Sequence, residues 1–180
     1  MSYSVELSDD TTLRLLTERD VGPVLDANKR NREHLAPWEP ARAESFFTTD
    51  DQTRILTGQL AELEAGAGYP LVFVNGARVI GRMTLSGIVR GPFQSASIGY
   101  WVDKDRAGQG LASAALRNVV KHCREDLGLH RIEAGTLLHN LGSQKVLRKA
   151  GFEPIGIAEK YLKIAGTWQD HLLFQRILSQ

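Results

Sequence analysis

The chain has 180 residues, of which 42% are apolar and 24% are charged, and its net charge is +1. This length supports one domain with a sizeable core, and the balanced charge gives no general electrostatic reason to expect a nucleic acid or an anionic membrane as a partner. The single cysteine, Cys123, excludes an intramolecular disulfide and a thiolate metal cluster, and we expect no metal site.

The first ten residues are polar and acidic, which is unlike a secretory signal. No apolar run approaches the roughly 18 residues that a membrane-spanning helix needs. We therefore expect a soluble, cytoplasmic protein.

The first part of the chain predicts one strand and two helices. Residues 11–16 alternate leucine with polar side chains, as in a half-buried strand. Thr17 then offers a helix N-cap followed by acidic residues, so a helix should run to about residue 32. A second helix is predicted from Thr49, and two glycines end it near residue 66.

A proline-containing run from Glu33 to Pro40 separates these two helices. Prolines disfavour helical backbone before them, so we predict a fixed, non-helical loop. Such loops often shape a substrate pocket; alternatively, this one is a rigid connector whose Trp38 packs on the core. His34, Trp38 and Glu39 are the residues that the loop offers for contacting a substrate.

The rest of the chain alternates strands and helices, with Asn75-Gly76 as a tight hairpin turn. The predicted strands lie at residues 69–74, 79–89, 94–102, 131–138, 152–165 and 167–177, and the predicted helices at 109–126 and 140–149. This pattern predicts a single α/β (α+β) domain over residues 1–180. Its mixed, mostly antiparallel, twisted sheet should have about seven strands, flanked by about four helices.

Apolar residues recur every four positions from Leu111 to Cys123 in the first of these late helices. Cys123 is therefore expected to be a small core residue and not a nucleophile. Residues 101–150 also hold nine Lys or Arg residues against five Asp or Glu residues. That excess fits an anionic ligand, although a solvated helix face would give the same pattern.

Gly108 and Gly110 flank Gln109 directly before the predicted helix. Glycines there let the backbone approach a ligand closely, and successive N–H groups at a helix start can cradle an anion. The run lacks the Gly-Lys-Ser/Thr of a P-loop and the glycine spacing of a dinucleotide fingerprint. An ordinary helix-opening turn remains the alternative.

The run Gly108-Gln109-Gly110-Leu111-Ala112 resembles the acyl-coenzyme A signature of the GCN5-related N-acetyltransferase (GNAT) superfamily. The family's second signature is matched by Asn140, Ser143, Val146, Leu147, Lys149, Gly151 and Phe152. Together the two signatures cover about residues 95–155. Within the superfamily, residues 34–40 and 160–171 are similar to the RimJ/RimL branch, in particular to RimJ. Members of that branch acetylate N-terminal α-amino groups of ribosomal proteins.

The resemblance implies a GNAT-like fold with acetyl-CoA as the acyl-donor co-substrate. It implies that the sheet opens after residues 94–102 and that the following residues bind the cofactor: Trp101, Val102, Ala107, Gly108, Gln109, Gly110, Leu111, Ala112 and Asn140. Ala107 departs from the family, which usually has Gln or Arg there; Arg106 or Lys104 could supply charge instead. Asn140 fits a helix N-cap equally well, and the two roles are compatible.

Ser143 is the catalytic candidate that the resemblance implies, because a hydroxyl near the sulfur can give a proton to the departing thiolate. The family often uses a tyrosine for this, but RimL-like members place a serine at this position. A plain helix-capping serine is the alternative. Gly135 stands near the point where some members carry a catalytic acid, and nearby Glu133 is expected to be structural, so no general base is evident. Water-relayed proton loss towards Glu39, Glu159 or His34 stays open.

The free energy needed to deprotonate an ammonium group helps to identify the acceptor. At pH 7 it is about 1.3 kcal/mol for an α-amine and about 4.6 kcal/mol for a lysine. A site without a strong base therefore suits an α-amine, and we expect the acceptor to be a protein N-terminus, in a monomeric or homodimeric enzyme. The alternatives are a small-amine acetyltransferase for detoxification or resistance and a non-catalytic acyl-CoA-binding module. An open groove with Glu33 and Glu39 would favour a peptide as acceptor. A closed aromatic pocket of Trp38, Phe46 and Phe47 would favour a small molecule.

Overall fold

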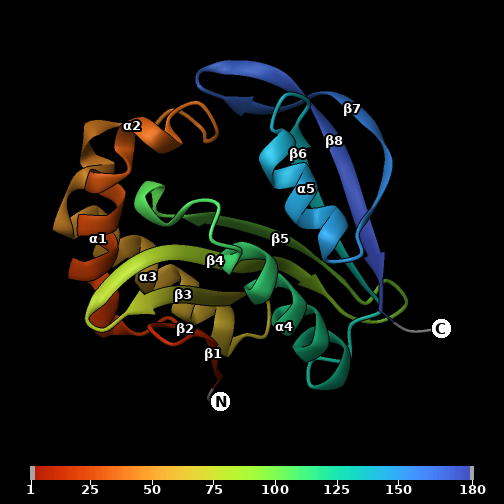
Figure 1. Ribbon diagram of the computed structural model, residues 1–180, viewed down its shortest axis with the longest axis horizontal. Coiled ribbons are helices and arrows are strands. Elements are labelled where there is room, and N and C mark those ends of the chain that lie inside the picture. Colours follow the sequence, from red (N-terminus) through yellow and green to blue (C-terminus); the bar gives the residue numbers. More distant parts are fainter. Residues whose placement is uncertain (1–2, 179–180) are drawn as a thin grey trace.

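The computed structural model describes residues 3–178 and shows one eight-stranded sheet with helices against both faces (Figure 1). The strands are β1 (Ser4–Ser8), β2 (Thr11–Leu15), β3 (Tyr69–Asn75), β4 (Arg78–Val89), β5 (Ser95–Val102), β6 (Arg131–Leu137), β7 (Glu153–Ile164) and β8 (Thr167–Ile177). The helices are α1 (Val21–Arg30), α2 (Arg32–Leu35), α3 (Thr49–Glu64), α4 (Leu111–Glu125) and α5 (Leu141–Lys149). Short 3₁₀ helices occupy Glu18–Asp20, Glu44–Phe47 and Lys104–Arg106.

The strand order is β1-β2-β3-β4-β5-β6-β8-β7, and each neighbouring pair is antiparallel except β5 and β6. The predicted mixed, mostly antiparallel sheet is therefore confirmed. The structure adds one strand, β1, that the sequence analysis left out. Val5 and Leu7 alternate with polar residues in this strand, but it has only five residues and lies at the sheet edge, so the pattern is too short to be a strong signal.

Two further predictions need correction around the proline-containing loop. The helix predicted to run to residue 32 breaks at Asn31, whose side chain bonds back to Ala27 O (2.9 Å) and accepts from Lys104 N (2.9 Å). A new helical turn, α2, then includes His34, which was expected in a non-helical loop. Pro37 constrains only the residue before it, so Leu35 still completes the turn through Asn31 O (2.8 Å).

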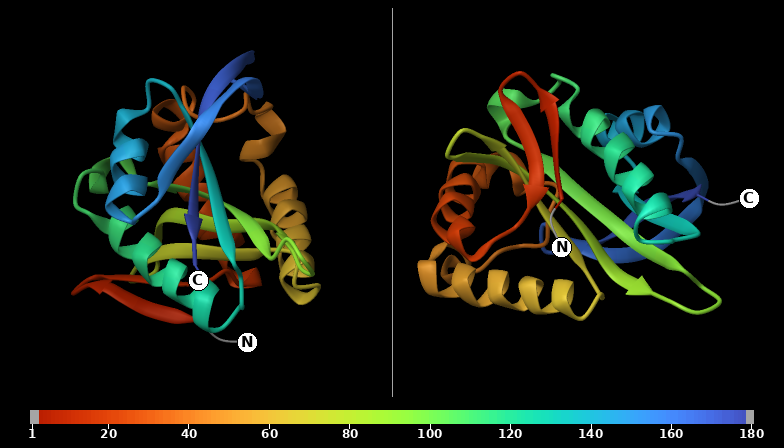
Figure 2. Two further views of the ribbon diagram at one scale, coloured as in Figure 1. Left: turned by 90° about the vertical axis from the view of Figure 1, so that its right-hand side faces the viewer. Right: turned by 90° about the horizontal axis from the view of Figure 1, so that it is seen from below.

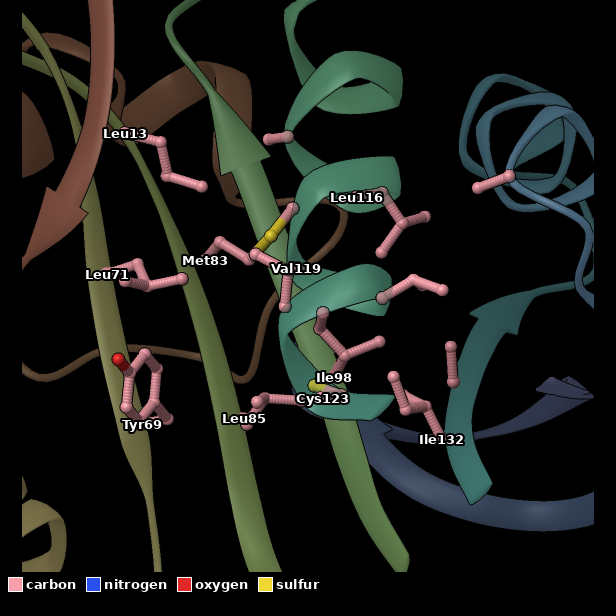
Figure 3. Packing of buried hydrophobic residues seen from close by; sticks show 14 of the residues in the cluster. Leu13, Tyr69, Leu71, Met83, Leu85, Ile98, Leu116, Val119, Cys123 and Ile132 are labelled. Atoms are coloured by element: carbon pink, nitrogen blue, oxygen red, sulfur yellow. The ribbon is translucent and has the colours of Figure 1, made fainter. Parts of the chain in front are cut away.

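Two apolar clusters hold the layers together. Helix α4 packs on one face of the sheet with α5 beside it, and α1 and α3 pack on the opposite face (Figure 2). We refer to these as the α5 face and the α3 face. Cys123 is fully buried in the α4 cluster, where burial raises its thiol pKa to about 12, which confirms its role as a core residue (Figure 3).

The sheet opens between its two parallel strands. Strands β5 and β6 pair only through Ser95–Ser97 and Arg131–Glu133. Beyond this point they separate, so the edge of residues 98–102 that turns towards β6 has no strand partner among residues 3–178 (Figure 1). Unpaired main-chain polar groups of this kind accept an extended ligand as an additional strand.

Candidate active site

A cleft of about 370 Å³ lies where β5 and β6 separate. Residues from α2 and the loop after it, from β4, β5, β6 and β8, and from the start of α5 line it. The lining residues are Leu35, Trp38, Glu39, Arg82, Thr84, Ser86, Ile98, Gly99, Tyr100, Trp101, Ala134, Gly135, Thr136, Leu137, Asn140, Ser143, Leu147 and His171. The topology thus brings seven separate elements to one site.

The loop after α2 crosses the opening of this cleft. Trp38 stacks on His139, with the ring centroids 5.4 Å apart, and Ala165 N donates to Glu39 O at 3.0 Å. Trp38 remains 38% exposed, so it packs against another loop and not in the core. Of the two interpretations offered for the loop, the structure therefore favours the one in which it shapes a pocket.

The cleft reaches both faces of the sheet. Tyr100 and Ile98 pack with the cluster under α4, whereas Trp101 packs with the cluster under α1 and α3. Arg82 is the cross-strand partner of Trp101 and therefore shares its α3 face. Two reactants can accordingly reach the gap from opposite faces.

On the α5 face, the hydroxyls of Tyr100 and Ser143 lie 3.0 Å apart. Burial raises the pKa of Tyr100 to about 12, so its phenol stays protonated near neutral pH. When Tyr100 donates to Ser143 Oγ, the hydrogen of the serine hydroxyl is free to point elsewhere in the cleft. Asn140 Oδ1 also accepts from Ser143 N at 3.0 Å, so the predicted N-cap of α5 is present.

The glycine turn lies at the start of α4, outside the lining of the cleft. Gly108 and Gly110 have φ values of 78° and 82°, a conformation that favours glycine. The main-chain N–H groups of residues 108–113 donate no hydrogen bond to any residue between 3 and 178. A row of unpaired N–H groups at the positive end of a 15-residue helix is suited to bind an anion.

A buried ion cluster fixes the residues that lead into this turn. Asp103 is fully buried and accepts from Arg30 Nε (2.8 Å) and Arg78 Nη2 (2.9 Å). Burial alone would raise the pKa of Asp103, but these two hydrogen bonds hold it below its ordinary value. The turn is thereby tied to α1 and β4.

The two cations proposed to compensate for Ala107, Arg106 and Lys104, differ in how available they are to a ligand. Arg106 pairs with Asp10 and contacts Gln109 Oε1 at 3.3 Å, so it would have to exchange partners to reach a phosphate. Lys104 is exposed. Within the described part of the chain it forms no ion pair, which leaves it as the readily available cation.

On the α3 face, Arg82 is half-buried and donates to Gln59 Oε1 at 2.6 Å. Burial lowers the pKa of its guanidinium to about 10, which leaves it cationic at neutral pH. Its Nε and the buried Thr136 Oγ1 find no partner among the residues that the structure covers. Buried polar atoms without partners are costly, so both are suited to contact a ligand or water in the cleft.

A second cavity of about 290 Å³ adjoins the cleft and shares Leu35 and Glu39 with it. Phe46 and Phe47 line this cavity, whereas Trp38 does not. The single aromatic pocket considered in the sequence analysis is therefore divided into two spaces.

The predicted site residues fall into three groups. Trp38, Glu39, Trp101, Asn140 and Ser143 line the cleft together. A second group lies at the glycine turn and the start of α4, outside the cleft lining: Ala107, Gly108, Gln109, Gly110, Leu111 and Ala112. Val102 follows Trp101 at the end of β5, and His34 lies on α2; neither lines the cleft.

The other base candidates from the sequence also lie outside the cleft lining. Glu133 pairs with Arg131 at 3.4 Å, as expected for a structural residue, and Glu159 is exposed on β7. Sequence reasoning did not single out Tyr100, Arg82, Thr136 or His171 as site residues. Only the alternation along β4 and β5 could have indicated that Tyr100 and Arg82 point to opposite faces.

Comparison with known proteins defines the class. The model of the acetyltransferase (GNAT) domain family matches residues 10–153, and this chain belongs to that family of N-acetyltransferases. The eight-stranded mixed sheet and the five α-helices of residues 3–178 form a single GNAT fold.

Its relatives are ribosomal-protein acetyltransferases of the RimJ/RimL group. The chain is 32% identical over 168 residues to the Escherichia coli [ribosomal protein uS5]-alanine N-acetyltransferase, covering 92% of this chain and 87% of that protein. The Vibrio fischeri ribosomal-protein-S5-alanine acetyltransferase structure superimposes with a TM-score of 0.94 at 33% identity, covering 99% and 98% of the two chains. Mycobacterium smegmatis RimJ, solved with a CoA disulfide, gives 0.88 at 34% identity, covering 93% and 81%.

None of the helices between residues 3 and 178 is long and apolar enough to cross a membrane. In the same range, no three His, Cys, Asp or Glu side chains are grouped as potential metal ligands.

Proposed function

We propose that this protein transfers the acetyl group of acetyl-CoA directly to the N-terminal α-amino group of a protein, with a ribosomal protein as the acceptor class. The observation that carries the donor assignment is the row of unpaired N–H groups at residues 108–113. It stands at a helix N-terminus, where a diphosphate is favoured by both hydrogen bonding and the helix dipole. The M. smegmatis relative with bound CoA supports the same ligand.

The remaining donor contacts follow the gap in the sheet. The free edge of residues 98–102 can pair with the amide groups of the pantetheine arm. Asn140 lies across the gap, where its amide nitrogen remains available while Oδ1 caps α5. This arrangement directs the acyl end towards Tyr100 and Ser143.

Ser143 and Tyr100 can then serve the departure of the thiol. The amine nitrogen attacks the carbonyl carbon of the thioester, the carbon–sulfur bond breaks, and the sulfur leaves as a thiolate. Ser143 Oγ gives its proton to that sulfur, and Tyr100 donates to Ser143 at 3.0 Å as the charge develops. A proton from solvent restores the pair. No acyl-enzyme is needed, because both reactants meet in one cleft.

Two features favour a protein N-terminus as acceptor. The carboxylate of Glu39 lines the cleft and can attract an ammonium group. The second cavity shares Leu35 and Glu39 with the cleft, so it offers space for residues that follow the acetylated one. A small amine would occupy the first space only.

Thiol release from acetyl-CoA with an acceptor panel tests this proposal. The panel holds peptides with a free N-terminal alanine, the same peptides with a blocked N-terminus and an internal lysine, and free small amines. We expect turnover with the free N-terminal peptides only. Turnover confined to small amines would contradict the proposed acceptor, and binding of acetyl-CoA with no turnover in any arm would instead indicate a non-catalytic module.

A further inference from the structure

We propose that His171 is the general base that takes the proton from the attacking ammonium group, a role that rests on the proposed acetyl transfer. His171 lies on β8 and is 3% exposed. It lines the cleft, although it lies 28 residues beyond Ser143 in the chain. The mechanism described above supplies a proton donor for the thiol but no group that receives the proton of the amine.

The position of His171 places it across the sheet from Ser143. Its cross-strand partner on β6 is Leu137, so it shares a face with Leu137 and with Gly135 two residues earlier. The alternate residue Ala134 packs in the cluster with α4 and Leu147 of α5. His171 therefore faces away from α5, while Ser143 approaches from it, which separates the base and the acid by the gap in which the acyl group would lie.

Gly135 leaves space beside the imidazole. A Cβ at Gly135 would lie 3.7 Å from His171 Cδ2 and 3.6 Å from Tyr161 Cε1, so a larger side chain would crowd both rings. Tyr161 also packs against the imidazole, with the ring centroids 5.5 Å apart. The ring is thus held in place by β7 and open towards the cleft.

One hydrogen bond fixes the chemical form of the ring. His171 Nδ1 lies 3.0 Å from the carbonyl oxygen of Gln169. A carbonyl oxygen only accepts, so Nδ1 must carry a hydrogen, and in the neutral ring the lone pair is on Nε2. Nε2 forms no hydrogen bond with the described residues, so that lone pair is available to a proton from the cleft.

The other charged and titratable groups that line the cleft or contact His171 do not compete well for this role. Arg82 on β4 is a cation, and Tyr100 on β5 holds its proton because its pKa is about 12. Tyr161 on β7 contacts the imidazole through its ring. Glu39 in the loop after α2 is the one carboxylate in the lining, and it contacts Arg42 at 3.3 Å. A carboxylate is a weaker base than imidazole, so Glu39 suits attraction of the ammonium better than its deprotonation.

Asp170 is adjacent in sequence but serves another purpose. Its Oδ1 accepts from Lys160 N at 2.9 Å and so holds the β7–β8 hairpin. It does not line the cleft. His171 is therefore the imidazole base that the fold brings to the acceptor end.

The step balances without any further reactant. Nε2 of neutral His171 takes one proton from the ammonium group, directly or through one water, and becomes imidazolium while the amine becomes neutral. The amine then attacks the thioester carbon. That nitrogen passes its second proton to solvent water as the amide forms, which balances the proton that solvent returns to Ser143. The imidazolium releases its own proton to solvent after the thiol has left.

The test compares wild type with His171→Asn, which keeps an N–H near the position of Nδ1 and lacks Nε2. We expect kcat with an N-terminal peptide to fall about 100-fold at pH 7, the range for loss of a general base. The loss should shrink to less than about 10-fold at pH 9.5, because an α-amine with a pKa of about 8 is then already neutral. Acetyl-CoA affinity by calorimetry should be unchanged.

A merely structural role for His171 would behave differently. It would reduce kcat by the same factor at every pH, and that result, or full activity of the variant at pH 7, overturns the proposal. His171→Gln gives the same comparison should the asparagine variant unfold. His122→Gln is the matched control, because His122 is half-buried on α4 outside the cleft lining, and it should keep the wild-type pH profile.

Failure of the proposed function is recognised independently. If wild type acetylates only a small amine, the protein-acceptor proposal is wrong, but the same pH comparison with that amine still decides the role of His171. If wild type acetylates the peptide and the His171→Asn and His171→Gln variants both match its kcat at pH 7, the acceptor proposal stands and the base assignment is wrong.

Discussion

The phenol of Tyr100 and the hydroxyl of Ser143 lie 3.0 Å apart, although the two residues are 43 positions apart in sequence. Tyr100 comes from β5 and Ser143 from the first turn of α5, so this contact joins the two halves of the opened sheet. The family resemblance pointed to a serine where other members use a tyrosine. The structure places both hydroxyls in one pair, and this suggests that they act together.

The first prediction concerns that pair. Ser143→Ala should lower kcat about 100-fold, and Tyr100→Phe about 10-fold, because the first removes the group next to the sulfur and the second only its hydrogen-bond partner. Thiol release at saturating acetyl-CoA and peptide measures both. The KM for acetyl-CoA should change little in either variant.

The double variant makes this prediction sharper. If the hydroxyls act as a unit, Tyr100→Phe should have almost no additional effect once Ser143 is alanine. Multiplication of the two single effects would show that they act independently, and full activity of Ser143→Ala would remove its role as proton donor.

The second prediction tests the glycine turn. Gly110→Asp should abolish measurable acetyl-CoA binding, because it places a carboxylate at the row of free N–H groups and a side chain at a φ of 82°. Isothermal calorimetry measures the affinity. Gly66→Asp is the control, since Gly66 has a φ of 68° and equally open surroundings but lies beyond the end of α3. Wild-type affinity in Gly110→Asp would refute the anion site.

The third prediction concerns the buried carboxylate that anchors the turn. Asp103→Asn should reduce the free energy of unfolding by about 2 kcal/mol, less than for a fully buried pair because Arg30 and Arg78 are partly exposed. Urea denaturation at pH 7 measures this. Acetyl-CoA affinity should fall as well, because the chain into the turn loosens.

The pH dependence of this effect has a definite sign. The folded-state pKa of Asp103 lies below its ordinary value of about 3.9, so its contribution is present above pH 4 and is lost as pH falls through the folded-state pKa. The difference between wild type and Asp103→Asn should therefore shrink below about pH 4. A constant difference down to pH 3 would contradict this origin.

Local patterns were sufficient to predict much of this molecule. Each of the seven predicted strands is present, and Asn140 is the cap of α5, because alternation, turn residues and caps act within a few residues. The glycine turn was recognised for the same reason. The predicted boundaries were wrong where a contact with a distant residue determines the end of an element. One example is Asn31, at the end of α1, whose side chain accepts a hydrogen bond from Lys104 N.

The chemistry of the cleft could not be predicted in this way. His171, Arg82 and Tyr100 are ordinary strand residues in the sequence, and only the order β4-β5-β6-β8 brings them to one gap. The hydrogen bond from His171 to Gln169 and the missing partner of Arg82 Nε are properties of packing. No spacing rule connects residues 82, 100 and 171.

The last prediction separates attraction of the acceptor from its chemistry. Glu39 is the one carboxylate in the cleft lining, and its contact with Arg42 is long, at 3.3 Å, so much of its charge remains available to an incoming ammonium. Glu39→Gln should raise the KM for an N-terminal peptide about fivefold, as expected for loss of about 1 kcal/mol of charge attraction in a partly solvated site. kcat should stay within a factor of two.

Salt and a neighbouring carboxylate provide the controls for Glu39. The KM of wild type should rise with added NaCl more steeply than that of Glu39→Gln, because the missing charge is the one that salt screens. Glu33 is exposed on α2 and does not line the cleft, so Glu33→Gln should leave the KM unchanged. A large fall in kcat with an unchanged KM in Glu39→Gln would instead identify Glu39 as the proton acceptor and would transfer to it the role that we assign to His171.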